Sequence, residues 1–196
     1  MNLRQLFRPD EVIMGVEPPH HFFLMAGYYR LDGRIMKPAQ VTRTNDYMPA
    51  GRGVYFRFRG LPQAKLQKII EGIKAQDGAF TLSCTLATCS ILQSAGLSMG
   101  DGKPPDIEPF KNFIRIMEHG FVDETGNKVN MEILASTADD LQHFVRSVRA
   151  IDHRVQSGIR AQVKEGGAEM FLDKIRAEHG EPPQEIVDFF RSWSPE

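Results

Sequence analysis

The chain has 196 residues, of which 41% are hydrophobic and 25% are charged. These fractions are typical of globular proteins and exclude a wholly disordered chain, collagen and a simple coiled coil. Lys and Arg total 24 and Asp and Glu total 25, so the net charge is −1 and no bulk charge favours nucleic acid. At this length we expect one domain with a substantial appendage, able to fold without disulfides or metals.

The charge is unevenly distributed along the chain. Residues 1–70 contain 11 Lys and Arg against 5 Asp and Glu, a net charge of +6, and the rest of the chain carries −7. A basic cluster lies between a predicted strand and a predicted helix, at Arg52, Arg57, Arg59, Lys65 and Lys68. A solvated charged face is the ordinary interpretation, and a site for an anionic substrate is the functional one.

Cysteine content and hydropathy predict a cytoplasmic protein. The longest apolar stretch, Phe22 to Ala26, is far shorter than the roughly 20 residues that cross a bilayer, and no secretory signal is visible. The two cysteines, Cys84 and Cys89, would lie on different faces of a helix, which disfavours a disulfide between them. Reduced cysteines suit the cytoplasm, although export by a specialised secretion system stays open. We expect no cofactor and no metal, because further zinc ligands are missing near the cysteines.

The first part of the chain predicts strands. The apolar run from His20 to Tyr29, bounded by prolines and Gly27, is typical of a buried strand. Asp32-Gly33 is a turn signal, after which residues 35–41 would return as a strand. A third strand is expected over residues 54–59.

Two helices are predicted next. Leu66, Ile69, Ile70 and Ile73 have the i, i+3, i+4, i+7 spacing of an amphipathic helix. The second helix is expected between a capping serine and a terminal glycine, from Ser83 to Gly96. Small residues dominate one face of this helix, at Cys84, Ala87, Thr88 and Ala95. That composition predicts a central helix packed closely against a sheet.

The remaining chain completes an α+β fold. A helix is expected over residues 110–117, a hairpin over residues 121–134, and helices from Ser136 onward. We therefore predict a small antiparallel sheet packed on a central Cys-bearing helix. Residues 1–136 would form this α+β core, and residues 137–196 a helical C-terminal extension.

Cys84 is the candidate nucleophile. At the first position of a helix, unpaired N–H groups and the helix dipole favour an anion, so we expect the pKa of its thiol to be lowered. The same N–H groups could hold an oxyanion. A buried structural cysteine is the competing interpretation, and it is the preferred one for Cys89, which lies in mid-helix.

A thiol nucleophile needs a base, which is usually histidine. His20 and His21 begin the first strand, where alternation sends one to each face. A histidine at a strand end opposite a helix N-terminus is the usual geometry of a Cys–His pair. If the base followed the cysteine in the chain, His119 at a helix end would be the best candidate.

These residues resemble a known family. The strand from His21 to Gly27, followed by Asp32-Gly33-Arg34-Ile35, precedes the helix that begins at Cys84. This order resembles the circularly permuted papain-like cysteine hydrolases, a group that includes bacterial amidases and lecithin:retinol acyltransferase-like enzymes. The resemblance covers residues 20–96. It implies Cys84 as nucleophile, His21 as base and acyl transfer through a thioester-type intermediate.

The family also places a polar residue that orients the histidine on the strand after the His strand. The matching stretch here is taken as Arg34 to Gln40. Lys37 stands near the expected position, but a cation cannot accept an imidazole N–H. Gln40 can accept one, so Gln40 is the predicted orienting residue.

Two functions are therefore predicted from different classes. The first is a cysteine hydrolase or acyltransferase that acts on an amide, ester or thioester, with a small-molecule or peptide-like acyl substrate. The second is a non-catalytic interaction module whose helical tail docks a partner. Its contacts would be Leu141, Phe144, Val145, Val148, Phe189, Phe190 and Trp193.

Overall fold

The computed structural model describes most of the predicted core and part of the tail. The described residues of the core are 8–17, 21–34, 37–43, 53–106 and 109–135. Those that follow are 146, 165–170, 172–174, 176–177, 181–182, 184, 187–188 and 191.

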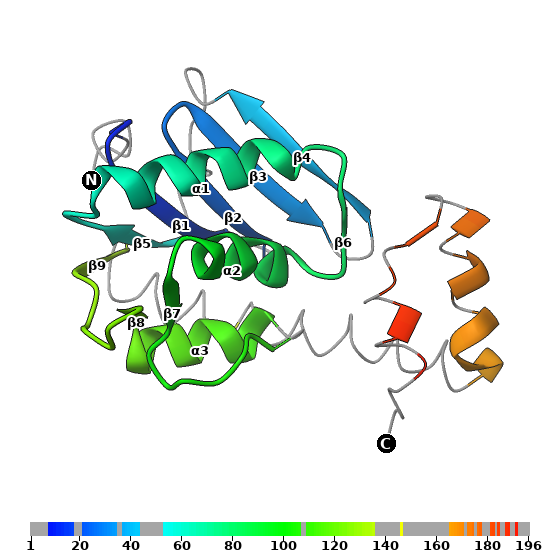
Figure 1. Cartoon of the computed structure of the whole chain (residues 1–196). Helices are drawn as coiled ribbons and strands as arrows, with labels where there is room; N and C mark the ends of the chain where they lie inside the picture. Colours follow the sequence, from blue (N-terminus) through cyan, green and yellow to red (C-terminus); the bar gives the residue numbers. More distant parts are fainter. Residues whose placement is uncertain are drawn as a thin grey trace.

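A seven-stranded sheet forms the centre of the fold (Figure 1). Its strand order is β6-β4-β3-β2-β1-β5-β9, and all neighbouring strands are antiparallel. The strands are β1 (Val12–Glu17), β2 (His21–Ala26), β3 (Tyr29–Arg34), β4 (Lys37–Arg43), β5 (Val54–Phe58), β6 (Phe80–Thr81) and β9 (Met131–Ala135). The predicted α+β class and the antiparallel sheet are confirmed, and the sheet is larger than expected.

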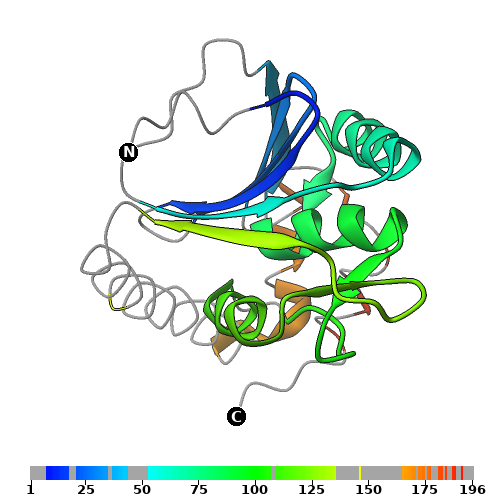
Figure 2. The ribbon, with the colours of Figure 1, turned by 90° about the vertical axis from the view of Figure 1, so that its left-hand side faces the viewer.

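Helices cover one face of this sheet. They are α1 (Gln63–Ala75), α2 (Cys84–Ser94) and α3 (Pro109–His119). Figure 2 shows α1 and α2 on the same side of the strands, and both contact β2 and β3. A two-stranded ribbon pairs β7 (Leu97–Met99), which follows α2 in the chain, with β8 (Phe121–Asp123), which follows α3. No described helix is long and apolar enough to cross a membrane.

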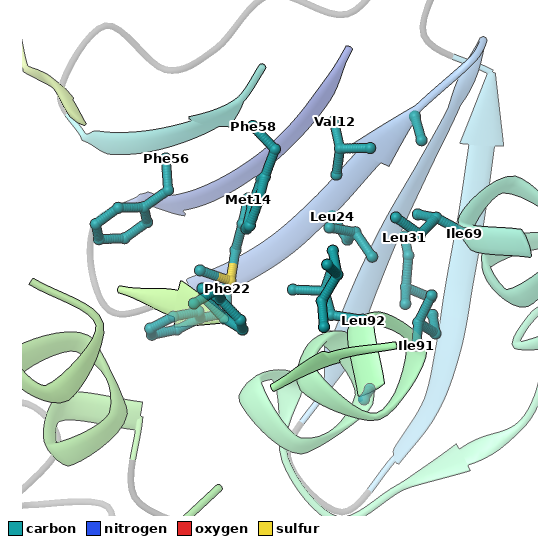
Figure 3. Packing of buried hydrophobic residues seen from close by; sticks show 14 of the residues in the cluster. Val12, Met14, Phe22, Leu24, Leu31, Phe56, Phe58, Ile69, Ile91 and Leu92 are labelled. Atoms are coloured by element: carbon teal, nitrogen blue, oxygen red, sulfur yellow. The ribbon is translucent and has the colours of Figure 1, made fainter. Parts of the chain in front are cut away.

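The main core lies between the helices and this face of the sheet. Alternation along β2 points Phe22 and Leu24 toward the helices, into the same buried cluster as Ile91 and Leu92 of α2, and Leu24 lies near Leu92 (Figure 3). Six phenylalanines are among the largest fully buried side chains, and Phe56 packs on Phe113 with ring centroids 5.9 Å apart. This packing fixes α2 over β2 and β3.

The opposite face of the sheet is also buried, but it mixes apolar and charged residues. Ile13, Phe23, Met25 and Tyr55 form a second apolar cluster. Buried charged residues occupy the same strands, at Glu17, Arg30 and Arg57. We call this the polar face of the sheet, and the face toward the helices the helix face.

One turn prediction is wrong, and one predicted hairpin has its turn in place but pairs its second strand elsewhere. Asp32-Gly33 lies inside β3, and the chain turns instead at Gly27-Tyr28, where Gly27 adopts a φ of +61° that favours glycine. The predicted hairpin over residues 121–134 is only partly formed. After the turn, residue 128 makes one isolated bridge to β8, and β9 then pairs with β5.

The predicted helical tail lies partly within the described residues. Residues 165–170, 172–174 and 176–177 are helical, and the first of these segments includes Gly166 and Gly167, which were expected to break the helical pattern. The predicted boundary between residues 136 and 137 lies outside the described residues.

Candidate functional site

Cys84 is the first residue of α2, as predicted. Ser83 is the N-cap, with an extended backbone and a side-chain oxygen that accepts a hydrogen bond from the Leu86 N–H at 3.2 Å. Such a cap satisfies one of the free N–H groups of the first helical turn. The cap at Ser83 sets the start of α2, so Cys84 is the first residue of the helix.

The N-terminus of α2 approaches the sheet unusually closely. A Cβ placed on Gly33 would lie 2.7 Å from the Cα of Cys84, so only glycine leaves room for this approach. The pairing of β2 with β3 also ends here, with Phe23 and Asp32 as the last partners. Gly33 lies in the bulge between Asp32 and Arg34, where the register of β3 and β4 shifts.

The sulfur of Cys84 lies beside Phe22, just beyond the last pair of β2 and β3 residues. The backbone N–H of Phe22 lies close enough to the sulfur to lower the pKa of the thiol, as do the backbones of Cys84 and Thr85. The Thr85 hydroxyl has the same effect, although it makes no hydrogen bond of normal geometry to any described residue. The sulfur is therefore surrounded by hydrogen-bond donors where the sheet opens.

Burial nevertheless decides the charge of both thiols. It raises the pKa of Cys84 above its ordinary value, and this effect outweighs the nearby N–H groups. The expected lowering of this pKa is therefore wrong, because Cys84 is only 2% exposed. Burial also raises the pKa of Cys89, to about 12. Both cysteines are free, and both are neutral thiols at physiological pH.

His21 is the first residue of β2, and its ring lies on the polar face. Its Nε2 is 2.7 Å from the Oδ1 of Asp32, which is on β3. Phe22 faces the helices, so alternation sends the ring of His21 to the opposite side of the strand. His21 and Cys84 thus approach the end of β2 from its two faces. The structure shows no hydrogen bond between these two described residues.

Asp32 is an ionised acceptor for this histidine. Burial acts to raise the pKa of Asp32, but hydrogen bonds from His21 and Arg30 more than offset it, and the pKa lies below its ordinary value of 3.8. An ionised carboxylate only accepts hydrogen bonds, so the Nε2 of His21 carries the proton in this pair. The other ring nitrogen, Nδ1, is then left to act as a base.

The sequence prediction for the orienting residue differs from this geometry. Gln40 is the β4 partner of Asp32, and its Oε1 accepts a hydrogen bond from Nη2 of Arg34 at 2.6 Å instead of contacting His21. Asp32 was missed because Asp-Gly was interpreted as a turn. Gly27 was the sequence signal that could have corrected this prediction. A turn at Gly27 places Asp32 on the strand that follows.

The other candidates lie away from Cys84 or have partners of their own. His119 ends α3 on the surface, where its nearest ionic partner is Glu118 at 3.7 Å. In the basic cluster, Arg57 and Arg59 both pair with Glu132. Among the described residues, no three His, Cys, Asp or Glu side chains form a group that could hold a metal.

Several other predicted residues lie outside the described part of the chain. They are His20, Arg52 and the proposed partner contacts of the tail, namely Leu141, Phe144, Val145, Val148, Phe189, Phe190 and Trp193.

Comparisons with known proteins found no matching family model, no matching curated protein and no matching solved structure.

Proposed function

We propose that this protein is a cysteine hydrolase or acyltransferase of permuted papain-like topology. Cys84 is its nucleophile, His21 its base, and Asp32 takes the orienting role predicted for Gln40. The carrying observation is the placement of the Cys84 sulfur beside the backbone of Phe22, one residue from the hydrogen-bonded pair of His21 and Asp32. The substrate class is an amide, ester or thioester.

The raised pKa of Cys84 makes the base essential in this proposal. A thiol held neutral by burial has to lose its proton as it attacks, so a nearby proton acceptor is required. The Nδ1 of His21 is suited to this task, because Asp32 holds the proton on Nε2. The proposal requires the sulfur and Nδ1 to meet at the open end of the β2–β3 ladder, where both residues lie next to Phe22.

The reaction then follows two balanced half-steps. The proton of the Cys84 thiol moves to Nδ1 of His21, and the sulfur bonds to the acyl carbon. The bond to the leaving group breaks, and that group takes the proton from His21, which leaves a thioester. Water or an acceptor alcohol or amine then gives a proton to His21 and bonds to the acyl carbon of the thioester. The bond between the acyl carbon and the sulfur breaks, the acyl product leaves, and His21 returns the proton to the sulfur, which restores the thiol.

The backbone around Cys84 supplies the oxyanion donors in this scheme. The N–H groups of Cys84 and Thr85 belong to the first turn of α2, where no intrahelical partner exists for them. The side chain of His21 is 32% exposed, whereas Cys84 is 2% exposed. The acyl group therefore reaches the sulfur from the polar face, past the imidazole.

The test combines thiol alkylation with ester hydrolysis. We expect iodoacetamide, followed by mass spectrometry of the folded protein, to modify Cys84 faster than Cys89. We also expect turnover of an activated p-nitrophenyl ester, which Cys84→Ala abolishes and Cys89→Ala leaves intact. The two cysteines are matched controls, because both are buried in the same helix.

A second variant tests the base. His21→Gln keeps an N–H donor for Asp32 but has no basic nitrogen, so the preference for Cys84 should fall by a factor of about 100 or more. Equal alkylation of the two cysteines in the folded wild-type protein, or a preference that survives His21→Gln, would overturn the proposal.

A further inference from the structure

A buried charge network continues from His21 along the polar face. The Oδ1 of Asp32 accepts from His21 Nε2 at 2.7 Å and from Arg30 Nε at 2.7 Å. Arg30 Nε also contacts Oδ2 at 2.8 Å, and its Nη2 lies 3.3 Å from Glu17 Oε2. The side chains of Arg30 and Glu17 are only 6% and 9% exposed. The guanidinium is thus held between two carboxylates from different strands.

Aromatic packing fixes the same guanidinium from a third direction. Its Cζ lies 3.9 Å from the ring centroid of Phe23, a cation–π contact. The ring of Phe23 in turn covers Gly15, where an added Cβ would lie 2.0 Å from the ring. Neighbours on three strands therefore restrict Arg30 to one position.

Stability alone is a weak reason for such a network. Burying ions costs desolvation energy, and a buried ion pair is often no more stabilising than apolar residues of similar volume. Its defined geometry is the more specific property. Arg30 touches both oxygens of Asp32, so it prevents the carboxylate from rotating away from the imidazole.

We propose that Arg30, held by Glu17, is a positioning residue that locks the Asp32 carboxylate and thereby keeps His21 in the Nε2–H tautomer. This inference rests on the proposed function, because it assigns Arg30 a role in preparing His21 for Cys84. Arg30 itself touches neither the sulfur nor the acyl group.

The experiment measures the tautomer directly by NMR of ¹⁵N-histidine-labelled protein. The His21 signals are assigned by their loss in His21→Gln. In Arg30→Met we expect the Nε2–H signature to give way to a mixture of tautomers, and the alkylation rate of Cys84 to fall about tenfold. The matched control is Arg57→Met. Arg57 lies on the same face of the sheet, and its side chain is 9% exposed. It forms an ion pair with the carboxylate of Glu132 and does not contact Asp32.

Arg57→Met should lower the free energy of unfolding to a similar degree. It should leave the tautomer of His21 and the alkylation rate of Cys84 unchanged. If Arg30→Met does not fold, Arg30→Lys is used, because it keeps the charge and removes the two-pronged contact. A folded Arg30 variant with an unchanged His21 tautomer would overturn the inference.

The two proposals fail in different ways. If Cys84 is unreactive in the wild-type protein but the tautomer of His21 still depends on Arg30, only the proposed function is refuted. If Cys84 is reactive but the tautomer of His21 does not change in the Arg30 variants, only the positioning role of Arg30 is refuted.

Discussion

Gly33→Ala tests the close approach of α2 to the sheet. The φ of Gly33 lies outside the left-handed region, so alanine can adopt the backbone conformation, and sterics is the only adverse effect. The new Cβ would lie 2.7 Å from Cys84 Cα and 3.1 Å from its carbonyl oxygen. Both atoms are backbone, so no side-chain rotation can relieve the contact.

The magnitude follows from the distance. Ordinary contact begins at 3.4 Å, so the start of α2 has to withdraw by about 0.7 Å. Overpacking of this kind costs about 1–3 kcal/mol, and the lower backbone entropy of alanine in the unfolded chain returns about 0.4–1 kcal/mol. We therefore expect a net loss of about 0.5–2 kcal/mol in the free energy of unfolding, measured by urea denaturation.

Gly72→Ala is the matched control, since it also presses on α2. Its Cβ would meet Cγ2 of Ile91 at 2.9 Å, a side-chain methyl group that moves only with the stiff χ1 of a helical isoleucine. Gly72 lies within α1, where alanine is favoured over glycine by about 1 kcal/mol. Stability should fall less than in Gly33→Ala, because the helix propensity of alanine offsets part of the overpacking, and Cys84 alkylation should not change. A Gly33→Ala variant as stable as the wild-type protein would refute the close approach of α2 to the sheet.

Three further predictions concern the cap, the carboxylate and the packing beneath Arg30. Ser83→Ala removes the hydrogen bond to the first turn of α2 and should cost about 1 kcal/mol in urea unfolding, whereas Ser83→Asp should restore most of it. Asp32 has a lowered pKa in the folded protein, so its stabilising contribution is present above the unfolded pKa of about 3.9 and is lost as pH falls through the folded value. Asp32→Asn should therefore flatten the loss of stability below about pH 4 in unfolding curves measured across acidic pH, and an unchanged acid dependence would contradict the assignment. Gly15→Ala should displace the ring of Phe23, cost about 1–3 kcal/mol and alter the NMR signals of His21, although it contacts no ionisable group of the site.

The parts of the site that depend on local chemistry could be predicted from the sequence. A serine before a run of small residues identified the start of α2, because capping involves only neighbours in the chain. A proline-bounded apolar run likewise located the strand that begins at His21. These predictions needed no knowledge of tertiary contacts.

Features that depend on distant partners could not be predicted in the same way. Asp-Gly usually forms turns, but pairing of β3 with strands on both sides keeps Asp32 extended. Alternation predicted that His20 and His21 point to opposite faces, without indicating which face would meet the helix. The helix dipole correctly suggested a lowering effect on the thiol of Cys84, but burial, which only the folded sheet creates, was stronger.

The two-sided approach to β2 also explains why the candidate pair lies at the end of the strand. Farther along β2, from Phe23 onward, ladder hydrogen bonds join the strand to β3 and separate the two faces of the sheet. A cysteine on the helix face and a histidine on the polar face could not meet there, since the backbone would lie between them. At Phe22 the ladder has ended, and Gly33 leaves space for the backbone of α2. The break in the β2–β3 ladder, together with the missing side chain at Gly33, is thus the geometric condition that the proposed Cys84–His21 pair requires.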